Sequence, residues 1–488
     1  MDFFSTRNKD IKLSGSEAII RGIAPDGGLF VPETFPSLGD LNDLIKLDYR
    51  DLASHILGLY FDDIKDNLGD ITKAAYDSKF PEEVVPLKET DAVFLELYHG
   101  KTHAFKDMAL SILPYLLKAS LEANGNDKNV LILVATSGDT GKAALEGFKD
   151  VEGVRAMVFY PKGGVSKIQE LQMLTQEGDN LDVFAIKGNF DDAQSAVKEA
   201  FTNKAYKDQL LDRGYELSSA NSINIGRLIP QIIYYVNSYL RLVEAGRLEE
   251  GQEVNICVPT GNFGNILAAY YAREMGLPVK KLIVASNDNK VLTDFFQSGT
   301  YDSKRDLLLT SSPSMDILIS SNLERLLYHI SGGDTEKVKA AMKGLDENKS
   351  YDWDLFEKGL FEAGFAGEED ITAAIKLAYD KYDYVIDPHT AAAYSVYEAY
   401  KGRTGDDTPT LIASTASPFK FPDKVLDSLG LDKDPDDFKR LEDLARIMKA
   451  NLPKSLRELK DKDILHEGVI EPGDMKKEVL ETLGDSDV

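Results

Sequence analysis

The segment Asn129–Gly141, NVLILVATSGDTG, decides the fold class of this chain. Residues 129–136 form a continuous apolar run rich in β-branched side chains, which is typical of a strand buried on both faces. The turn after this run leads into an amphipathic segment, Lys142–Lys149, which predicts a helix. Because a strand, a short turn and a helix are the repeating unit of parallel sheets, the segment predicts an α/β protein.

The same alternation continues on both sides of this segment. Further apolar runs predict strands at Val154–Tyr160, Leu181–Ile186, Glu253–Val258 and Lys281–Ala285. Amphipathic segments predict helices at 166–174, 191–211 and 266–275. We therefore expect a two-lobed α/β protein with parallel-rich sheets, whose ligands bind outside the carboxyl ends of the strands.

The composition limits the class of partner. The chain has 488 residues and a net charge of −26, from 56 Lys and Arg against 82 Asp and Glu. This length predicts roughly two to four domains, and the acidic excess disfavours nucleic acids and anionic membranes as partners. The single Cys257 excludes a disulfide framework. The sequence has neither a membrane-spanning apolar run of about 18 residues nor the order of a secretory signal, so we expect a cytoplasmic protein.

The outer parts of the chain have weaker patterns. The N-terminal part to about Thr90 is mixed, residues 308–378 are mainly helical in pattern, and the charged tail after Asp432 predicts a solvated helix with a disordered end at 485–488. We expect an N-terminal region over 1–90, a smaller lobe over 91–240, and a larger lobe with a helical tail over 241–488.

The turn Val258–Ile266, VPTGNFGNI, lies between a predicted strand and a predicted helix. Its two glycines allow close approach of the backbone to a ligand, and the amides at the start of the helix attract an anion. A phosphate can bind there without a cation, which suits an acidic protein. A tight turn that needs glycine only for its dihedral angles is the alternative.

A second turn, Thr136–Lys142 (TSGDTGK), is similar to a nucleotide P-loop but fails two of its requirements. Thr136 stands where the first glycine belongs, and Ala143 follows Lys142 where Ser or Thr is required. What remains is a loop of hydroxyls and amides at a helix start, which suits a carboxylate.

Two histidines, His99 and His103, have the spacing of zinc ligands on a helix. Gly100 between them disfavours a helix, and no further ligand cluster stands nearby in the sequence. We therefore do not expect a metal site.

Lys106 opens the amphipathic segment that follows the apolar stretch Ala92–Leu97. The start of a helix disfavours a cation, and Phe105 beside the lysine indicates partial burial. Both effects lower the pKa of an amine, which suits a nucleophile that forms a Schiff base. A surface lysine is the alternative.

Six motifs occur together along the chain. They are His99–Asp107 (HGKTHAFKD), Thr136–Gly141 (TSGDTG), Asn221–Gln231 (NSINIGRLIPQ), Pro259–Asn265 (PTGNFGN), Asp387–Ala391 (DPHTA) and Thr415–Phe421 (TASPFKF). With FSTR at 4–7 and APDGGL at 24–29, they resemble the longer, bacterial and fungal-type branch of the threonine synthases, a family of pyridoxal-phosphate (PLP) enzymes. The resemblance runs from Asp2 to about Lys424.

This resemblance implies the tryptophan-synthase-β-like fold of PLP enzymes, fold type II, with an N-terminal extension and the cofactor between two α/β lobes. It implies that Lys106 holds PLP as a Schiff base and that Thr415 offers its hydroxyl to the pyridine nitrogen. The residues implied to bind the cofactor phosphate are Gly261, Asn262, Phe263, Gly264 and Asn265. The residues implied to bind the substrate, through its α-carboxylate, are Ser137, Gly138, Asp139, Thr140 and Gly141.

The implied reaction is the last step of threonine biosynthesis, in which O-phospho-L-homoserine and water become L-threonine and phosphate by γ-elimination and β-addition. Lys106 is then the catalytic base, because its amine is released beside the substrate Cα. The leaving phosphate needs cations, for which we predict Arg227 and Lys420, with Asn221 and Ser222 as helpers. A structural ion pair is the alternative role for these two cations.

Two positions differ from the common pattern of the relatives. Asp139 stands where many of them have Asn, whose amide contacts the pyridoxal 3′-oxygen, and a carboxylate interacts with that oxygen differently. Ile225 stands where an aromatic residue is common before the Arg of this motif.

Two other functions compete with this interpretation. One is another PLP lyase of the same fold, such as a serine/threonine dehydratase or a cysteine synthase. Those enzymes carry the shorter motifs SFK-x-R and SGN. The other is a non-catalytic paralogue that binds a phosphorylated ligand, which would need neither Lys106 nor Thr415. A monomer and a homodimer are both open, as is closure of residues 308–378 over the substrate.

Overall fold

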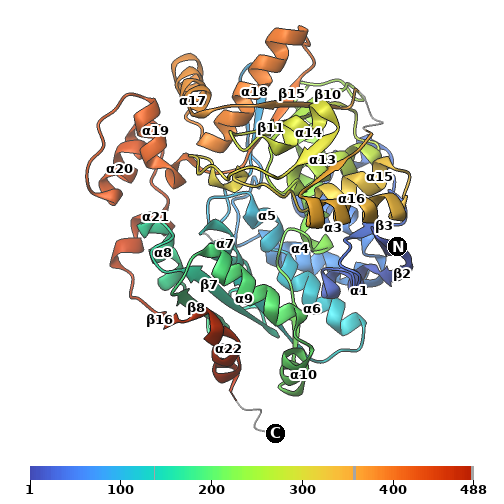
Figure 1. Cartoon of the computed structure of the whole chain (residues 1–488). Coiled ribbons are helices and arrows are strands. Elements are labelled where there is room, and N and C mark those ends of the chain that lie inside the picture. The colour runs from blue at the N-terminus through green and yellow to red at the C-terminus, as the bar shows by residue number, and fades with distance from the viewer. Residues whose placement is uncertain (137, 355–358, 485–488) are drawn as a thin grey trace.

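A five-stranded parallel sheet forms around the segment that predicts the fold class. The computed structural model describes residues 1–136, 138–354 and 359–484 (Figure 1). In sheet order the strands are β16 (Gly468–Ile470), β8 (Leu181–Ile186), β7 (Val154–Pro161), β6 (Asn129–Ala135) and β9 (Tyr215–Ser218). The helices that follow β6, β7 and β8 are α7 (Asp139–Phe148), α8 (Lys167–Leu174), α9 (Phe190–Thr202) and α10 (Lys204–Asp212). This sheet is the centre of the smaller lobe.

A six-stranded sheet is the centre of the larger lobe. Its strands, in order, are β14 (Phe361–Phe365), β11 (Val279–Ser286), β10 (Val254–Pro259), β15 (Thr410–Ser414), β5 (Val93–Glu96) and β4 (Leu87–Glu89). All neighbours are parallel except β4 and β5. Its main helices are α12 (Pro230–Glu244), α13 (Gly264–Glu274), α14 (Val291–Ser298), α17 (Glu368–Tyr382) and α18 (Pro388–Thr404). Parallel sheets with helical crossovers in both lobes confirm the predicted fold class.

The N-terminal region forms a small antiparallel sheet and several helices. The elements are β1 (Asp2–Ser5), β2 (Asn8–Ser14), α1 (Gly15–Arg21), β3 (Phe30–Pro32), α2 (Leu41–Leu44), α3 (Tyr49–Tyr60) and α4 (Leu68–Tyr76). Helix α1 packs on α6 (Leu113–Ala123), and α3 packs on α12. The guanidinium of Arg7 also donates two hydrogen bonds of 2.8 Å to Glu324, in α15 (Leu323–Ile330), so this region is fixed to the larger lobe.

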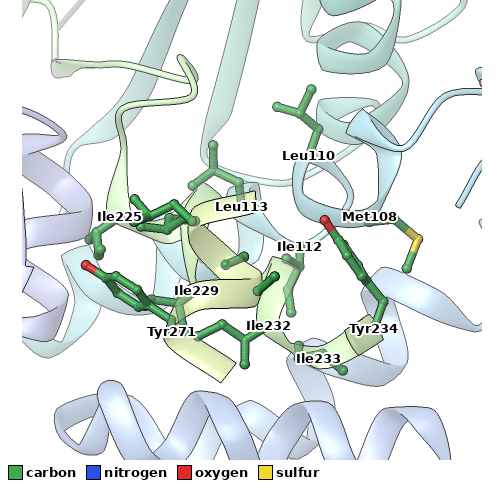
Figure 2. Close-up of a cluster of buried hydrophobic side chains, with 14 of the residues drawn as sticks. Met108, Leu110, Ile112, Leu113, Ile225, Ile229, Ile232, Ile233, Tyr234 and Tyr271 are labelled. Atoms are coloured by element: carbon green, nitrogen blue, oxygen red, sulfur yellow. The ribbon is translucent and has the colours of Figure 1, made fainter. Parts of the chain in front are cut away.

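A core of buried side chains supports the helix that begins with Lys106, α5 (Lys106–Leu110). Figure 2 shows this core, in which side chains from the α5–α6 segment meet those of α11 (Ile225–Leu228) and α12. The residues at 0 % exposure include Met108, Leu110, Ile112, Leu113, Ile225, Ile229, Ile232 and Tyr234. Burial of each such side chain contributes roughly 1.5–3 kcal/mol. The aliphatic side chain of Ile225 is therefore part of this buried core.

Two predicted helical stretches differ in the structure. The helix predicted over 191–211 is two helices, α9 and α10, because the side chain of Asn203 accepts the Tyr206 amide and caps the second. The stretch 308–378 contains α15, α16 (Thr335–Asn348) and the start of α17, but also β13 (Ser350–Asp352) and β14. Strand β13 pairs with β12 (Thr300–Asp302) in a short ribbon.

The C-terminal tail after Asp432 is mostly exposed, as predicted, but it forms several short helices and a strand rather than one helix, and a few of its side chains are buried. After α19 (Pro422–Ser428), it runs from α20 (Asp437–Ile447) and α21 (Lys454–Arg457) beside the larger lobe to β16 and α22 (Met475–Leu483) on the smaller lobe (Figure 1). Strand β16 pairs with β8, and Met475 and Val479 of α22 lie at 1 % and 0 % exposure in the core of that sheet. The end predicted to be disordered, 485–488, lies outside the described residues.

The predicted domain boundaries differ from sheet membership in two places. Strands β4 and β5, of which β5 falls in the range 91–240, belong to the sheet of the larger lobe. Strand β16 falls in the range 241–488 but belongs to the sheet of the smaller lobe. The chain thus crosses between the lobes more often than a division by sequence implies. In the described ranges, no helix has both the length and the apolar character needed to cross a membrane.

Packing of α22 predicts that its core side chains hold the tail in place. We expect Met475→Ala to cost roughly 2–5 kcal/mol locally, because a fully buried side chain is truncated. The expected readout is at least a tenfold faster hydrogen exchange of the α22 and β16 amides. Leu465→Ala, at a residue with 53 % exposure in the same tail, is the matched control and should leave exchange unchanged. Equal exchange in Met475→Ala and the wild type would show that α22 does not depend on this core.

Candidate active site

Three neighbouring strands of the larger sheet bring the predicted cofactor residues to one edge. Strand β15 lies between β10 and β5, and all three are parallel. The segments after them are therefore adjacent, and these carry Gly261–Asn265, Thr415 and Lys106. The last two segments are tied directly, because the Phe105 amide donates to the Thr415 carbonyl at 2.8 Å and the Ser417 amide donates to the His103 carbonyl at 3.0 Å.

The loop before Lys106 is shaped by a buried aspartate. The amide and hydroxyl of Thr102 donate to the two carboxylate oxygens of Asp107 at 2.8 and 2.6 Å. A Cβ at Gly100 would lie 2.5 Å from Asp107 Oδ2, so only glycine allows this turn. Burial raises the pKa of Asp107 to about 6, against the two hydrogen bonds from Thr102. The motif HGKTHAFKD therefore encodes the geometry of the turn that presents Lys106.

Lys106 stands at the start of α5 and is only partly exposed. Burial lowers the pKa of its amine to about 8; Asp139 opposes this shift, and Lys420 and Arg227 add to it. No hydrogen bond or ion pair engages the amine within residues 1–136, 138–354 and 359–484. About a tenth of the amine is thus neutral and nucleophilic at pH 7, far more than for a lysine with its ordinary pKa.

The turn after β10 has the features of a phosphate site. Phe263 has a left-handed φ of 63° and precedes the first turn of α13, whose first amides have no partners within the helix. Asn265 is 7 % exposed, and its side-chain nitrogen, Nδ2, lacks a hydrogen-bond partner among the described residues. Its side-chain oxygen, Oδ1, accepts the Tyr235 hydroxyl. A helix start and an unpartnered buried donor therefore meet at this turn.

A second turn, at 312–316, and Ser320 after it hold this loop. A Cβ at Gly261 would lie 2.4 Å from the Ser314 carbonyl oxygen in that turn, and the Gly261 carbonyl accepts the Ser320 hydroxyl at 2.8 Å. His389 Nε2 accepts the Ser314 amide at 3.2 Å, so Nδ1 carries the ring hydrogen and donates to Asp387 at 2.7 Å. Asp387 also caps α18, which gives the motif DPHTA its structural role.

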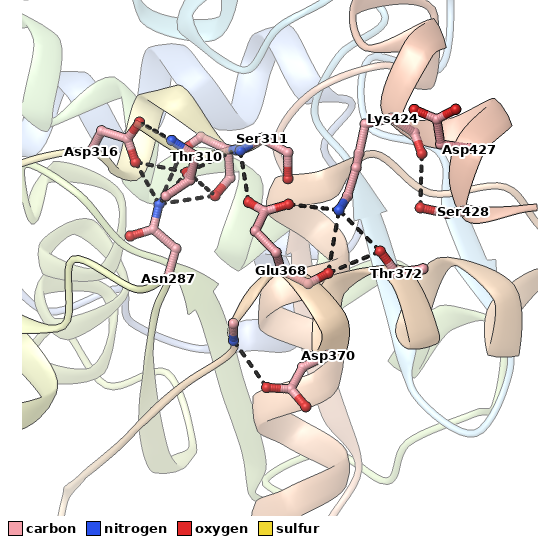
Figure 3. A network of polar contacts seen from close by, with 12 residues as sticks. Asn287, Thr310, Ser311, Asp316, Glu368, Asp370, Thr372, Lys424, Asp427 and Ser428 are labelled. Carbon is pink, nitrogen blue, oxygen red and sulfur yellow. Dashed lines mark hydrogen bonds and ion pairs between the residues drawn. The ribbon is translucent and has the colours of Figure 1, made fainter. Parts of the chain in front are cut away.

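Further polar contacts anchor the loop around residues 310–316 (Figure 3). Asn287 donates to Thr310 at 2.9 Å and to Asp316 at 2.7 Å. From the other side, Glu368 accepts the Ser311 amide at 2.8 Å and the ammonium of Lys424 at 2.6 Å. The part of 308–378 beside the phosphate loop is therefore held by hydrogen bonds from two directions.

Arg325 is a structural residue that the sequence patterns did not identify. It is 0 % exposed and donates to the Phe30 carbonyl at 2.8 Å and to the Ile223 carbonyl and the Asn322 side chain at 2.5 Å each. Asn322 in turn donates to the Asn262 carbonyl at 3.0 Å. One guanidinium thus connects the N-terminal region, the motif that contains Arg227, and the phosphate loop. Arg325 lies in the short helix α15, and nothing in the hydrophobic pattern of that helix indicates this structural role.

Arg227 is buried on α11, at 5 % exposure. Its Nη1 donates to the Ala220 carbonyl at 2.8 Å, while its buried Nε has no hydrogen-bond partner in the described part of the chain. Burial lowers the pKa of the guanidinium to about 10, so the group is still a cation. The turn before α11 carries Asn221, which is exposed, and Ser222, which is partly buried. A buried cation with an unused donor is suited to an anionic ligand.

The turn after β6 brings Asp139 toward this region, at the start of α7. The Thr136 hydroxyl accepts the amides of Gly138 and Gly141 at 3.0 and 2.8 Å, which folds the turn tightly. Ser137 lies outside the described residues. Thr140 is partly buried in the first turn of α7.

Lys420, predicted as a cation for the substrate phosphate, forms an ion pair with Asp139 at 2.9 Å. The ammonium also donates to the Thr102 carbonyl at 3.0 Å. Both side chains of the pair are below 10 % exposure, at 6 % and 9 %. The structural ion pair named as the alternative is therefore formed, and Arg227 is the candidate cation without a carboxylate partner among the described residues.

The two histidines with zinc-like spacing do not converge. His99 contacts Glu96 at 2.7 Å, and His103 contacts Ser455 of the C-terminal tail at 2.8 Å. Within the described residues, no group of three or more His, Cys, Asp or Glu side chains could hold a metal ion.

Comparison with known proteins shows the class of enzyme to which the chain belongs. The family model described as "Pyridoxal-phosphate dependent enzyme" matches residues 86–415. The models "Threonine synthase N terminus" and "Threonine synthase, C-terminal" match residues 2–76 and 390–463. The fold is thus that of a PLP-dependent enzyme of fold type II.

Individual relatives then define the family. The chain is 36 % identical to the threonine synthase of Saccharomyces cerevisiae, over 91 % of this chain and 94 % of that one. The crystal structure of PLP-bound threonine synthase from Brucella melitensis is 32 % identical, with a TM-score of 0.87 and 100 % of both chains covered. The chain belongs to the threonine synthase family. It is also 39 % identical to the human protein threonine synthase-like 1, of whose length it spans 58 % and which matches 85 % of this chain.

The turn geometry predicts that Gly100 is required. In Gly100→Ala the new methyl group would meet the Asp107 carboxylate, so we expect the free energy of unfolding to fall by about 1–3 kcal/mol. Chemical denaturation would measure this change. The matched control is Gly402→Ala on α18, where a Cβ meets no atom within 4 Å and alanine should stabilise the helix by about 0.5–1 kcal/mol. If the two variants had equal stability, the Asp107 contact would not control the turn.

Proposed function

We propose that this chain is a threonine synthase that converts O-phospho-L-homoserine and water into L-threonine and phosphate. One observation carries the proposal: two buried donors lack partners among the described residues, Asn265 Nδ2 in the turn after β10 and Arg227 Nε, and the charge of Arg227 acts on Lys106. One suits the phosphate of a cofactor and the other the phosphate of a substrate. The family models for both ends of the threonine synthases also favour this function over a dehydratase or a cysteine synthase.

The residues present fit pyridoxal phosphate. Lys106, with a pKa lowered to about 8, would hold the cofactor covalently, and Gly261–Asn265 would hold its phosphate through amides and the free Asn265 donor. Thr415, 6 % exposed at the end of β15, would face the ring nitrogen with its hydroxyl. When bound, the cofactor supplies an electron sink for the loss of protons at the substrate α- and β-carbons.

The chain supplies positioning and proton transfer. Once the substrate amine is bound, the free amine of Lys106 would lie beside Cα and would take up and return the proton of that carbon. The amides at the start of α7, with Gly138, Asp139, Thr140 and Gly141, and with Ser137 of the same turn, hold the α-carboxylate. Arg227, assisted by Asn221 and Ser222, stabilises the phosphate as it leaves Cγ. Over the whole reaction one proton leaves Cβ, one is added at Cγ, water gives its hydroxyl to Cβ and its remaining proton to phosphate, and the proton taken from Cα is returned.

Other aspects of the proposal rest on composition. The net charge of −26 supports a small-molecule substrate rather than nucleic acid. A cytoplasmic location and a monomeric or homodimeric state are further parts of the proposal.

Lys106 gives the most direct test of the cofactor site. The purified protein should form a borohydride-stable pyridoxyl adduct, and Lys106→Ala should abolish it and lower phosphate release by at least about a hundredfold. Adduct formation by the apoprotein should rise with pH through about 8, because the neutral amine reacts. Lys101→Ala, an exposed lysine of the same loop, is the matched control and should retain the adduct. An adduct mapped to another lysine would refute this assignment.

Arg227 separates substrate binding from cofactor binding. For Arg227→Gln we expect a loss of about 10- to 100-fold in kcat/KM with O-phospho-L-homoserine, since a charge-assisted hydrogen bond contributes about 1.5–3 kcal/mol. The cofactor content per chain should stay as in the wild type. Arg21→Gln, an exposed arginine at the end of α1, should change neither quantity. A parallel loss of cofactor would assign Arg227 to the cofactor instead.

A further inference from the structure

A buried ion pair joins the two lobes beside Lys106. Lys420 belongs to the segment after β15 in the larger lobe, and Asp139 starts α7 in the smaller lobe. Their side chains are 2.9 Å apart and 6 % and 9 % exposed. The second hydrogen bond of Lys420, to the Thr102 carbonyl, reaches the loop that presents Lys106. Three loops therefore meet at one ammonium group.

The orientation of Asp139 is also fixed from its own lobe. Gln169 donates through Nε2 to Asp139 Oδ1 at 2.9 Å. Its amide cannot be reversed without loss of a second bond, because Gln169 Oε1 accepts the Ser166 amide at 3.2 Å in a capping box. Gly138, with φ +136°, makes room for this contact, since a Cβ there would lie 2.6 Å from the Gln169 amide.

Both donors reach the same oxygen of Asp139. Lys420 and Gln169 each contact Oδ1, and in the described part of the chain no hydrogen bond reaches Oδ2. One carboxylate oxygen is therefore clamped, and the other is available as an acceptor. An asparagine in this position would present a donor or lose one of the two contacts, which gives a physical reason for aspartate here.

Several charges act on the Lys106 amine. Asp139 favours its charged form, whereas Lys420 and Arg227 disfavour it, and Asp107 on the same helix favours it. Although burial alone would raise the pKa of Asp139, Lys420 and Lys106 hold that pKa well below its usual range. The charges of Asp139 and Lys420 thus have opposite effects on the pKa of the Lys106 amine.

We propose that Lys420 bridges the lobes by pairing with Asp139, so that a buried cation and a buried carboxylate of opposing effect are fixed beside the amine of Lys106. This inference rests on the proposed function, since its purpose is to set the charge around the linkage between Lys106 and the cofactor. Lys420 then acts on the linkage by its own charge, while Gln169 keeps Asp139 in place, and it leaves the substrate phosphate to Arg227.

The test is a pH titration of the absorbance of the holoenzyme, which reports the protonation of the lysine–cofactor linkage without turnover. Loss of a nearby cation raises the pKa of a cationic linkage, and loss of a nearby anion lowers it. We expect Lys420→Gln to raise this pKa by about one unit and Asp139→Asn to lower it by about one unit. The double variant should return to within about half a unit of the wild type.

Two controls separate charge from packing. Lys420→Arg keeps the cation and should remain close to the wild-type pKa. Lys424→Gln removes a lysine of the same segment that instead pairs with Glu368, and it should leave the titration unchanged. If Lys420→Gln fails to fold, the lowered pKa of Asp139→Asn together with the wild-type pKa of Lys420→Arg supports the proposal.

The proposal is overturned if Lys420→Gln and Asp139→Asn shift the pKa in the same direction, or if neither folded variant shifts it. When Lys420→Gln is unfolded, an unshifted Asp139→Asn overturns it. Failure of the proposed function is distinguishable, because the reduced wild-type protein would then carry no pyridoxyl group on Lys106 in peptide mapping. That result would overturn both proposals.

Discussion

The parallel pairing of β15 between β10 and β5 is the constraint on which the site depends. These strands are far apart in sequence, yet their pairing places the ends of all three at one edge of the sheet. The phosphate loop and Thr415 follow the ends of β10 and β15 directly, and Lys106 follows the end of β5 after the loop 97–105. Hydrogen bonds between Phe105 and Thr415 and between Ser417 and His103 form a separate antiparallel bridge that joins the loops after β15 and β5. A shift in this register would separate the lysine from the other two elements.

The electrostatics of the interior differ from those of the surface. The chain has a net charge of −26, but Lys106, Arg227 and Lys420 all act on one buried region. Charges on the outer surface are screened beyond about 8 Å at physiological salt, so they do not decide which ligand this region binds. Within the described residues, only Lys420 of these three has a carboxylate as a bonded partner. A cofactor and a substrate that each carry a phosphate would balance the remaining positive charge.

Local sequence patterns predicted individual strands, helices and candidate residues. Contacts between distant segments, which such patterns do not contain, decided which of these lie together. The apolar run at 129–136 predicted β6 almost to the residue, since burial on both faces leaves a continuous signal. The motifs identified Lys106 and the turn at 261–265 as candidates because their chemistry is local. The pairing of β16 with β8 and the ion pair of Lys420 with Asp139 join segments hundreds of residues apart. No periodicity within either segment carries information about such partners.

In the proposed function a single cofactor spans from the start of α13 to Lys106. The decisive measurement is a crystal structure of the protein grown with pyridoxal phosphate. We expect phosphate density against the amides of Gly261–Asn265 and the Asn265 side chain, with continuous density from the ring to Lys106 Nζ. Density for the phosphate at Arg227, or a ring joined to any other lysine, would contradict it.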